Sequence, residues 1–497
     1  MPFPLETALL ALAGLLLLGY AIDFFFTSLD DPREPRRIAP KICIPVIGHV
    51  LGLIRYGFNY YHLLSQTTSA EIYSLGVLNF KIYITKTTRL AHLVQKSKSL
   101  SFTPFLKVPR DAVSGEAHAL FDGALLDKFS TGTKEALAPG PHLDAQNLRM
   151  GRQLLVHATE LVQRDEVKLF EWAKHTIVQA TAAGLYGVHH PFREQTVEDA
   201  LWVWEENRPR QMLGIDPLHT ARNARATVFR AFKDYFGRGL PDDVSYLVTR
   251  RQELLREGGI SEEDAYKMQA TLSNAAYPNT VPTLFWTVYE IYSRPALLGD
   301  IRLELMEKAV ERDGPGFVLD IAALQTECPL ILSVYQETQR TRHAQVAWRM
   351  VTEDTTLDRW TLKKGNYLQM PVRPVHESQT VYGPLADEFD PYRFVPSSDK
   401  TRVAPSSFLA WGSAPHLCPA RQFASTEILI AAALLVLRVE LNPIGGWERA
   451  LAVKGGTPTL PRPKSDMRLR VTPRKEGNAL WRVVVGKGKA RISLASG

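Results

Sequence analysis

The hydrophobic pattern of the chain begins with one long apolar run. Residues 5–26 are almost wholly apolar and are interrupted only by Glu6 and Asp23. At about 1.5 Å per residue, a helix of this length is roughly 30 Å long and can cross a bilayer once. A cleaved signal peptide is the alternative, but no basic segment precedes the run and no A-x-A-like site closes it. The run therefore predicts an N-terminal membrane anchor over residues 1–27.

Basic residues follow the anchor and set its expected orientation. They are Arg33, Arg36, Arg37 and Lys41. The positive-inside rule keeps such a flank, and the body of the protein behind it, in the cytosol. Prolines stiffen the chain in the same stretch, so we expect a basic, proline-containing hinge over residues 28–50.

Behind the hinge, the periodicity predicts mostly helix with a small sheet. Residues 71–85 partly alternate between apolar and polar, which predicts two short strands joined near Gly76. Helical spacing runs from about Asp144 to Tyr186 and predicts Gly184 as the C-cap. A second long helix is expected from Glu262 to Ser293 despite the prolines within it.

The C-terminal part adds a buried helix and further strands. The segment F-A-S-T-E-I-L-I-A-A-A-L-L-V-L after Arg421 is apolar nearly all round, which is typical of a buried helix. The stretches R-L-R-V and W-R-V-V-V beyond Met467 are predicted strands. Because no linker, internal repeat or low-complexity run divides the chain, we expect one large, mainly α domain over residues 51–497.

Composition excludes several classes of function. The 497 residues are 45% hydrophobic and 22% charged, which is ordinary for a globular protein with a large core. The net charge of +7 comes from scattered residues without a basic, aromatic-rich patch, so we expect no nucleic-acid partner. The three cysteines lie far apart without a C-x-x-C pair, which disfavours a zinc site or a disulfide framework and fits a reducing compartment.

Cys418 carries the most informative local pattern, W-G-S-A-P-H-L-C-P-A-R, from Trp411 to Arg421. A turn-forming glycine and a basic histidine precede the cysteine, and a long apolar helix follows it. A thiolate at a helix N-terminus is stabilised by the macrodipole and by free backbone N–H groups, and such a lone thiolate can ligate haem iron. A buried structural cysteine is the alternative for this loop taken alone.

Two further motifs lie upstream of the cysteine. Glu337 and Arg340 stand three residues apart in Y-Q-E-T-Q-R, and F-D-P-Y-R-F ends at Phe394, 24 residues before Cys418 (418 − 394). In order and spacing the three motifs resemble E-x-x-R, P-E-R-F and the loop F-x-x-G-x-R-x-C-x-G of the cytochrome P450 superfamily. The resemblance covers essentially the whole chain. It implies a P450-like fold behind one transmembrane helix, with haem b held by Cys418.

The resemblance also implies roles for residues around the haem. Glu337, Arg340 and Arg393 would form a buried ion triad, in which loss of one member strands a charge. The cysteine loop departs from the family pattern: Trp411 and His416 replace phenylalanine and arginine, and alanines stand at positions 414 and 420 where glycines are usual.

Haem propionates need cations. The resemblance assigns Arg349 and His416 to this role, with ordinary surface charges as the alternative, and Trp411 to the haem-binding loop. Arg149 and Arg152 lie in a segment that could add another basic partner.

The centre of the long helix bears on the chemistry. Residues 276–280, A-Y-P-N-T, align with the family sequence A/G-G-x-D/E-T. The resemblance implies that the Thr280 hydroxyl assists oxygen activation and proton delivery. Asn279 replaces the acid and, as an amide, cannot relay a proton by ionising, so we expect it to orient water or substrate. Tyr277 puts a large ring where glycine usually leaves space. The pocket walls are expected at residues 274–283 and 344–348.

The pattern N-T-x-P…F-W resembles the branch that holds sterol ring hydroxylases and prostacyclin synthase. Those hydroxylases activate dioxygen with electrons from NADPH, whereas prostacyclin synthase lacks the threonine and isomerises a peroxide. Thr280 therefore favours a monooxygenase that hydroxylates or otherwise oxidises a lipophilic substrate such as a sterol or terpenoid. The alternative is a haem–thiolate isomerase or dehydratase that acts without a reductase. A non-catalytic haem-binding membrane protein has only the two loop alanines in its favour.

Partners and location follow from the same resemblance. It implies NADPH–cytochrome P450 reductase as the electron donor and the endoplasmic reticulum membrane as the location, with a single span and a cytosolic catalytic domain. Lys400, Arg402 and Arg421 are candidates for the reductase-docking face; a generic solvated surface is the alternative.

Overall fold

The protein was analysed as a computed structural model, which describes residues 5–106, 120–121, 123–212, 214–397, 403–447, 460–486 and 491–497. The helices are α1 Leu5–Ser28, α2 Gly48–Tyr56, α3 Asn59–Ser65, α4 Thr88–Lys96, α6 Ala124–Ala136, α7 Pro141–Val162, α8 Leu169–Tyr186, α9 Gln195–Met212, α10 Thr220–Gly237, α11 Tyr246–Glu257, α12 Glu262–Ala270, α13 Ser273–Ala276, α14 Thr280–Tyr292, α15 Pro295–Lys308, α16 Ile321–Thr326, α17 Pro329–Arg342, α18 Val372–His376, α19 Gln379–Tyr382 and α20 Arg421–Arg438. The strands are β1 Ile72–Val77, β2 Phe80–Thr85, β3 Leu100–Ser101, β4 Glu166–Lys168, β5 Val310–Asp313, β6 Gly316–Asp320, β7 Val346–Val351, β8 Thr355–Leu357, β9 Trp360–Leu362, β10 Tyr367–Pro371, β11 Val439–Pro443, β12 Arg468–Pro473 and β13 Trp481–Val484.

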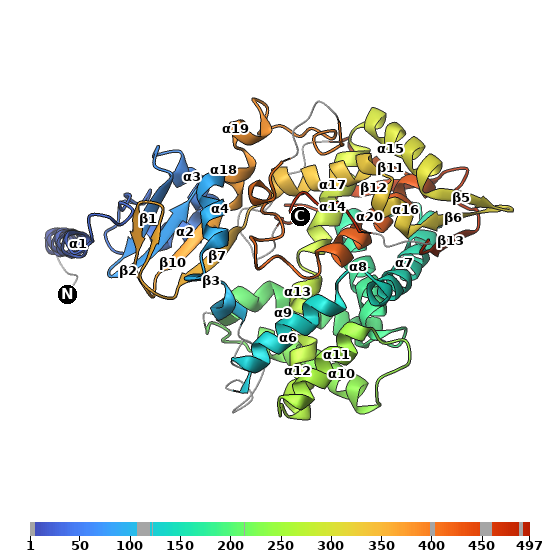
Figure 1. The fold of residues 1–497 in the computed structure, drawn as a ribbon, viewed down its shortest axis with the longest axis horizontal. Coiled ribbons are helices and arrows are strands. Elements are labelled where there is room, and N and C mark those ends of the chain that lie inside the picture. The colour runs from blue at the N-terminus through green and yellow to red at the C-terminus, as the bar shows by residue number, and fades with distance from the viewer. Residues whose placement is uncertain are drawn as a thin grey trace.

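The molecule has a sheet-bearing end and a larger helical end (Figure 1). The main sheet has the order β1-β2-β10-β7-β3, and α1 stands beside this end of the molecule. A three-stranded sheet, β11-β12-β4, brings the C-terminal chain against the start of α8. The prediction of a mainly α fold with a small β component is therefore confirmed.

The predicted hairpin exists, but its turn lies later than expected. Gly76 is a paired residue of β1, opposite Lys81 of β2. The turn is made instead by Leu78 and Asn79, and Leu78 adopts a left-handed conformation with φ 55°. The turn was misplaced because a glycine is the stronger turn signal in sequence.

The helix predicted from Asp144 to Tyr186 is two helices, α7 and α8, separated by the short strand β4. Gly184 is not their C-cap. The cap is Gly187, with φ 77°, while Gly184 lies inside α8. A Cβ on Gly184 would meet Cβ of Met150 on α7 at 3.1 Å, so this glycine allows close packing of the two helices.

The helix predicted from Glu262 to Ser293 is broken into α12, α13 and α14. Pro278 lies in the second break and has no N–H for a helical hydrogen bond. The N–H groups of Thr280 and Val281 both turn to the carbonyl of Tyr277, at 3.1 Å each. This change of hydrogen-bond partners begins a new helix, α14. Pro278 therefore interrupts the predicted helix instead of only bending it.

The apolar helix predicted after Arg421 is confirmed as α20, which is buried from Gln422 to Arg438 apart from Ala424. It lies in the helical end of the molecule against α7, α14 and α15. At the opposite end, α1 is long and apolar enough to cross a membrane, and none of its residues 9–28 is buried against the rest of the protein.

Candidate functional site

Cys418 lies in a tight loop that leads into α20. The N–H of Cys418 donates to the carbonyl of Trp411 at 2.9 Å, which closes the loop. Gly412 makes this closure possible: it has φ 85°, and a Cβ there would lie 3.3 Å from the carbonyl oxygen of His416. Arg421, the first residue of α20, donates its N–H to the carbonyl of Cys418 at 3.3 Å. The sulfur is therefore presented just before a helix N-terminus, as the sequence predicts.

Two opposing effects act on the Cys418 thiol. Burial raises its pKa above the ordinary value of a cysteine, which is the larger effect. A hydrogen bond from the Ala420 N–H and the positive charge of Arg421 lower the pKa in part. Burial therefore disfavours the thiolate more strongly than these two groups favour it. A metal ion bound to sulfur supplies the missing positive charge and deprotonates a coordinating thiol.

Arg349 on β7 reaches this loop from the sheet. Its side chain donates from Nη2 to the carbonyls of Ser413, at 2.7 Å, and Ala414, at 3.2 Å. The residue is only 2% exposed, and burial lowers the pKa of its guanidinium to about 10. No carboxylate of the described residues forms an ion pair with it. A buried cation in this state lacks a counter-charge.

His416 belongs to the Cys418 loop, and its ring lies near the Arg349 side chain. Its ring packs at 5.7 Å from the ring of Phe102, and the Arg349 guanidinium lies 6.0 Å from the centre of that ring. Burial lowers the pKa of His416, and the charges of Arg349 and Lys134 lower it further. Burial and these two charges therefore favour the neutral form of the His416 ring when no anion is bound beside it.

Several buried polar atoms around the loop have no hydrogen-bond partner within the described part of the chain. They are Nε of Arg349, Nε1 of Trp411 and Oγ of Ser413. Buried polar groups in folded proteins are nearly always hydrogen-bonded. A thiol able to ligate iron, a buried guanidinium without an anion and these unpaired atoms together suit haem, whose propionates are anionic. The residues present therefore fit the cofactor that the sequence motifs imply.

The predicted ion triad is present in the structure. Arg340 holds both carboxylate oxygens of Glu337 at 2.7 Å, and Nε of Arg393 lies 3.0 Å from Oε1. Arg340 also donates to the backbone carbonyls of residues 376, 386 and 388. All three members of the triad are therefore satisfied, and they tie α17 to the chain that leads to the cysteine loop.

Thr280 and Asn279 lie at the break between α13 and α14. The Thr280 hydroxyl donates to the carbonyl of Ala276 at 2.8 Å, a group that the interrupted helix leaves without its usual N–H. The carbonyl of Asn279 accepts the hydroxyl of Thr283 at 2.6 Å. The ring of Tyr277 packs edge-to-face against Phe192 at 5.5 Å and is fully buried. Tyr277 is thus a core side chain, rather than a ring standing in space that a glycine would leave open.

The structure brings Cys418, Trp411, His416 and Arg349 together in one loop-and-strand unit. Thr280 and Asn279 lie on a separate element, whose helix α14 packs against α17 and α20. Arg149 is directed elsewhere, because its Nη2 donates to the carbonyl of Gly184 at 3.1 Å.

Sequence analysis did not identify Lys134 on α6, whose positive charge lowers the pKa of His416. No spacing motif marks it. Arg152 is exposed on α7, and Lys400 and Arg402 lie outside the described residues.

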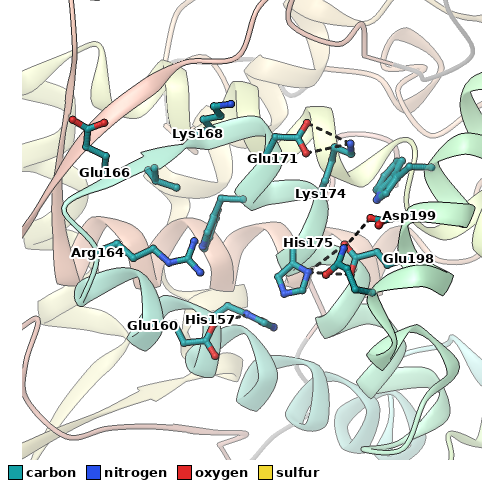
Figure 2. A pocket seen from close by; sticks show the side chains of 14 residues that line it. His157, Glu160, Arg164, Glu166, Lys168, Glu171, Lys174, His175, Glu198 and Asp199 are labelled. Atoms are coloured by element: carbon teal, nitrogen blue, oxygen red, sulfur yellow. Dashed lines mark hydrogen bonds and ion pairs between the residues drawn. The ribbon is translucent and has the colours of Figure 1, made fainter.

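A separate cleft of about 500 Å³ lies between α7, β4, α8 and α9 (Figure 2). His157 and His175 face each other at its centre, with ring centres 5.0 Å apart, and Nδ1 of His175 pairs with the buried Glu198 at 2.9 Å. This pair joins α8 to α9 and raises the pKa of His175. None of the residues named from the sequence lines the cleft, which we regard as distinct from the cysteine site.

Comparison with known proteins identifies the family. A family model described as Cytochrome P450 matches residues 241–458. The cytochrome P450 monooxygenase nodJ of Hypoxylon pulicicidum is 34% identical over 493 residues and covers 94% of this chain and 95% of its own. A cytochrome P450 monooxygenase of Gibberella zeae is 26% identical over 467 residues, with coverages of 90% and 88%. A crystal structure of a cytochrome P450 matches with a TM-score of 0.67 at 15% identity, covering 89% of this chain and 100% of that one. With its cysteine loop, its buried ion triad and this match over nearly the whole chain, the protein belongs to the cytochrome P450 family and is a monooxygenase of that family.

Proposed function

We propose that the protein is a membrane-anchored haem–thiolate monooxygenase that hydroxylates or otherwise oxidises a lipophilic substrate with O2 and NADPH-derived electrons. The observation that carries the proposal is the joining of Arg349, a buried cation without a protein anion, to the loop that presents Cys418. Cys418 can thereby supply a sulfur ligand for the iron while Arg349, bound to the same loop, supplies a cation for the propionates.

Each residue of the site has a role in this proposal. Cys418 would ligate the iron, Arg349 and His416 would bind the propionates, and Trp411 would contribute its free Nε1–H to the haem-binding loop. Haem b would supply the oxygen-activating chemistry when bound. The protein would orient the substrate and exclude water from the site.

Proton supply is assigned to the break before α14. The Thr280 oxygen, which now donates to Ala276, retains lone pairs that can accept a proton-bearing partner such as water. Asn279 orients water or substrate there. The substrate lies between residues 274–283 and 344–348.

The substrate class and the electron donor rest on resemblance. The N-T-x-P…F-W pattern supports a sterol-like or terpenoid substrate and a place in the branch of sterol ring hydroxylases. NADPH–cytochrome P450 reductase would dock on a basic face that includes Arg421. The apolar α1 supports an anchor over residues 1–27, a hinge over 28–50 and a catalytic domain over 51–497 on the cytosolic side of the endoplasmic reticulum membrane.

The first experiment is the carbon monoxide difference spectrum of the dithionite-reduced protein. Wild type should show the strongly red-shifted Soret band of a thiolate-ligated haem, and Cys418→Ser should lose it. Cys328→Ser is the matched control, because Cys328 is also a free cysteine but is buried at the start of α17. A band that survives Cys418→Ser, or is lost equally in Cys328→Ser, would reject the ligand assignment.

A second candidate function is an isomerase or dehydratase without a reductase, which the replacement of the usual acid by Asn279 favours. Thr280→Ala separates the two. Loss of product formed per NADPH consumed supports oxygen activation, whereas unchanged coupling removes the role given to Thr280. Thr287→Ala is the control, since its buried hydroxyl makes the same kind of bond to a carbonyl four residues earlier, at 2.8 Å.

A further inference from the structure

The segment of residues 491–497 lies far from the strand that precedes it. Strand β13 stands at the outer edge of the helical end, whereas the C-terminus lies at the centre of the molecule (Figure 1). There the segment is hydrogen-bonded to α17 and to α20. It therefore contacts both the helix that carries the ion triad and the helix that follows the cysteine loop.

Two apolar side chains anchor this segment in the core. Ile492 and Leu494 are each 1% exposed and belong to the main hydrophobic cluster. They alternate with Arg491 and Ser493, which are exposed. Because burial of apolar surface is the main stabilising contribution in a folded protein, these two side chains hold the segment against the helices.

Two buried glutamines, one on each helix, bind the backbone of the segment. Oε1 of Gln422 accepts the N–H of Ile492 at 2.9 Å, and its Nε2 donates to the carbonyl of Ile492 at 3.0 Å. Oε1 of Gln336 accepts the N–H of Ala495 at 2.6 Å. Residues 491–497, which we call the C-terminal clasp, thus join α17 to α20 at its first turn.

The C-terminal clasp reaches the cysteine loop through Arg421. Nε of Arg421 donates to the carbonyl of Gly497 at 3.3 Å, and Nη1 donates to the carbonyl of Cys418 at 3.3 Å. Burial lowers the pKa of Arg421, and the positive charge of Arg491 lowers it further. Since both effects disfavour a cation here, the two carbonyls are what holds the guanidinium in place between the clasp and the loop.

The position of this cation matters for the sulfur of Cys418. Burial raises the pKa of the thiol, and the charge of Arg421 lowers it in part, so the cation stabilises negative charge on sulfur. Reduction of a thiolate-ligated haem adds one more negative charge at the same place. A nearby cation favours that reduced state by Coulomb attraction and raises the reduction potential.

We propose that the C-terminal clasp is a positioning element for Arg421, and that Arg421 held in this way raises the reduction potential of the haem. The proposal rests on the haem ligation by Cys418 proposed above. It gives a role in electron uptake to a segment that lies more than 70 residues after the cysteine (491 − 418 = 73).

A redox titration with mediator dyes tests the proposal on the full-length, haem-loaded protein, and it needs no reductase. Leu494→Ala weakens the clasp. Leu441→Ala is the matched control, because Leu441 is 3% exposed in the same core but lies on β11. We expect a more negative potential in Leu494→Ala and the wild-type potential in Leu441→Ala, although both variants lose stability. An equal shift in the two variants, or none in Leu494→Ala, would overturn the proposal.

Gln336→Leu is a milder clasp variant, in case Leu494→Ala gives too little folded protein. It keeps the approximate size of the side chain and removes the acceptor of the Ala495 N–H. We expect a shift of the potential in the same direction but smaller. A wild-type potential in a folded Gln336→Leu protein whose clasp is released, as shown by faster proteolysis after Arg491, would contradict the positioning role.

A double-mutant cycle tests whether the clasp acts through Arg421. Arg421→Gln should lower the potential at least as much as Leu494→Ala, and the double variant should show no further fall. Arg421→Lys keeps the charge but loses the fork that joins two carbonyls, so it should retain part of the wild-type potential. A fully additive fall in the double variant would show that the clasp acts by another route.

The carbon monoxide difference spectrum separates this inference from the proposed function. A thiolate band in wild type and in every variant, with equal potentials, would overturn the role of the C-terminal clasp alone. Absence of the band in wild type would overturn the haem–thiolate assignment itself.

Discussion

Two arginines of equal burial have different kinds of partner. Arg340 on α17 lies between the carboxylate of Glu337 and three backbone carbonyls. Arg349 on β7 has carbonyl partners alone and a free Nε. Both are 2% exposed. The first cation has its counter-charge in the fold, whereas the second, next to the Cys418 loop, has none among the residues that the structure describes.

The difference separates a structural charge from a cofactor-binding one. A buried ion needs compensation, because its desolvation costs several kcal/mol. Where the protein supplies the anion, the charge holds the fold together whether or not a ligand is bound. Where it supplies none, an external anion gains most from binding there. The same side chain at equal burial therefore serves two purposes, and the four predictions below test that division.

The largest effect is expected for Arg340→Met. Of the two cations that contact buried Glu337 it leaves Arg393, and loss of one member of such a group costs roughly 3–5 kcal/mol. The variant should give little folded protein, and its midpoint in urea should fall sharply in the haem-free state. Arg470→Met, at an exposed position of β12, is the control and should change stability by no more than about 0.5 kcal/mol. An Arg340→Met protein as stable as wild type would show that Arg340 is not a structural charge.

Arg349→Met, the same substitution at the second site, should act on the cofactor instead. The haem-free protein should keep its stability, because a buried cation without a counter-charge is removed. A charge-assisted hydrogen bond is worth about 1.5–3 kcal/mol, which corresponds to about a 12- to 160-fold faster loss of haem. Haem transfer to excess apomyoglobin measures this rate. Unfolding of the haem-free variant, with haem loss unchanged, would place Arg349 with Arg340 as a structural charge.

Glu427 on α20 offers the acidic counterpart of Arg349. The hydroxyl of Thr181 donates to its carboxylate at 2.6 Å, and burial raises the pKa of Glu427 from 4.5 to about 8. Between these values the unfolded chain releases a proton that the folded chain keeps, so stability should fall as pH rises, by at most about 1.4 kcal/mol per unit.

Glu427→Gln keeps the shape of the side chain and should remove this slope, so that the variant gains on wild type as the pH rises from 5 to 8, about the range between the two pKa values. Urea unfolding across that pH range measures the free energy of unfolding of both proteins. Glu311→Gln, at an exposed strand position, should leave the slope in place. Parallel curves for wild type and Glu427→Gln would mean that this acid is ionised inside the fold.

The smallest effect is expected for His416→Ala. His416 is held neutral by burial and by nearby Arg349, so it offers haem an uncharged hydrogen bond worth about 0.5–1.5 kcal/mol. Haem loss should accelerate by a factor of about 2 to 12, less than in Arg349→Met. Haem transfer under the same conditions ranks the two variants, and a larger effect at His416 would reverse the assignment of the main anion-binding group.

Much of the fold could be predicted from sequence because it depends on local pattern. The apolar runs predicted α1 and α20, and the alternation at residues 71–85 predicted β1 and β2. Errors arose where two signals competed. Gly184 resembles a helix cap but serves the close packing of α7 on α8, and this neighbour is invisible in a linear pattern. The break before α14 depends on which carbonyls the prolines leave unpaired, and on Thr280 taking one of them.

What the sequence by itself determined is the identity and order of the chemical groups: a lone cysteine before an apolar helix, an acid and a base three apart, and a threonine after a proline. Residue type and spacing suffice for these, since covalent order and helical period are local. Only the tertiary structure decided which charge is buried without an anion. Arg340 has its carboxylate partner, Glu337, three residues away on the same helix, whereas the carbonyls of Ser413 and Ala414 that contact Arg349 come from residues distant along the chain. Desolvation and partner geometry are properties of the packed state, and they distinguish a charge that stabilises the fold from one suited to bind haem.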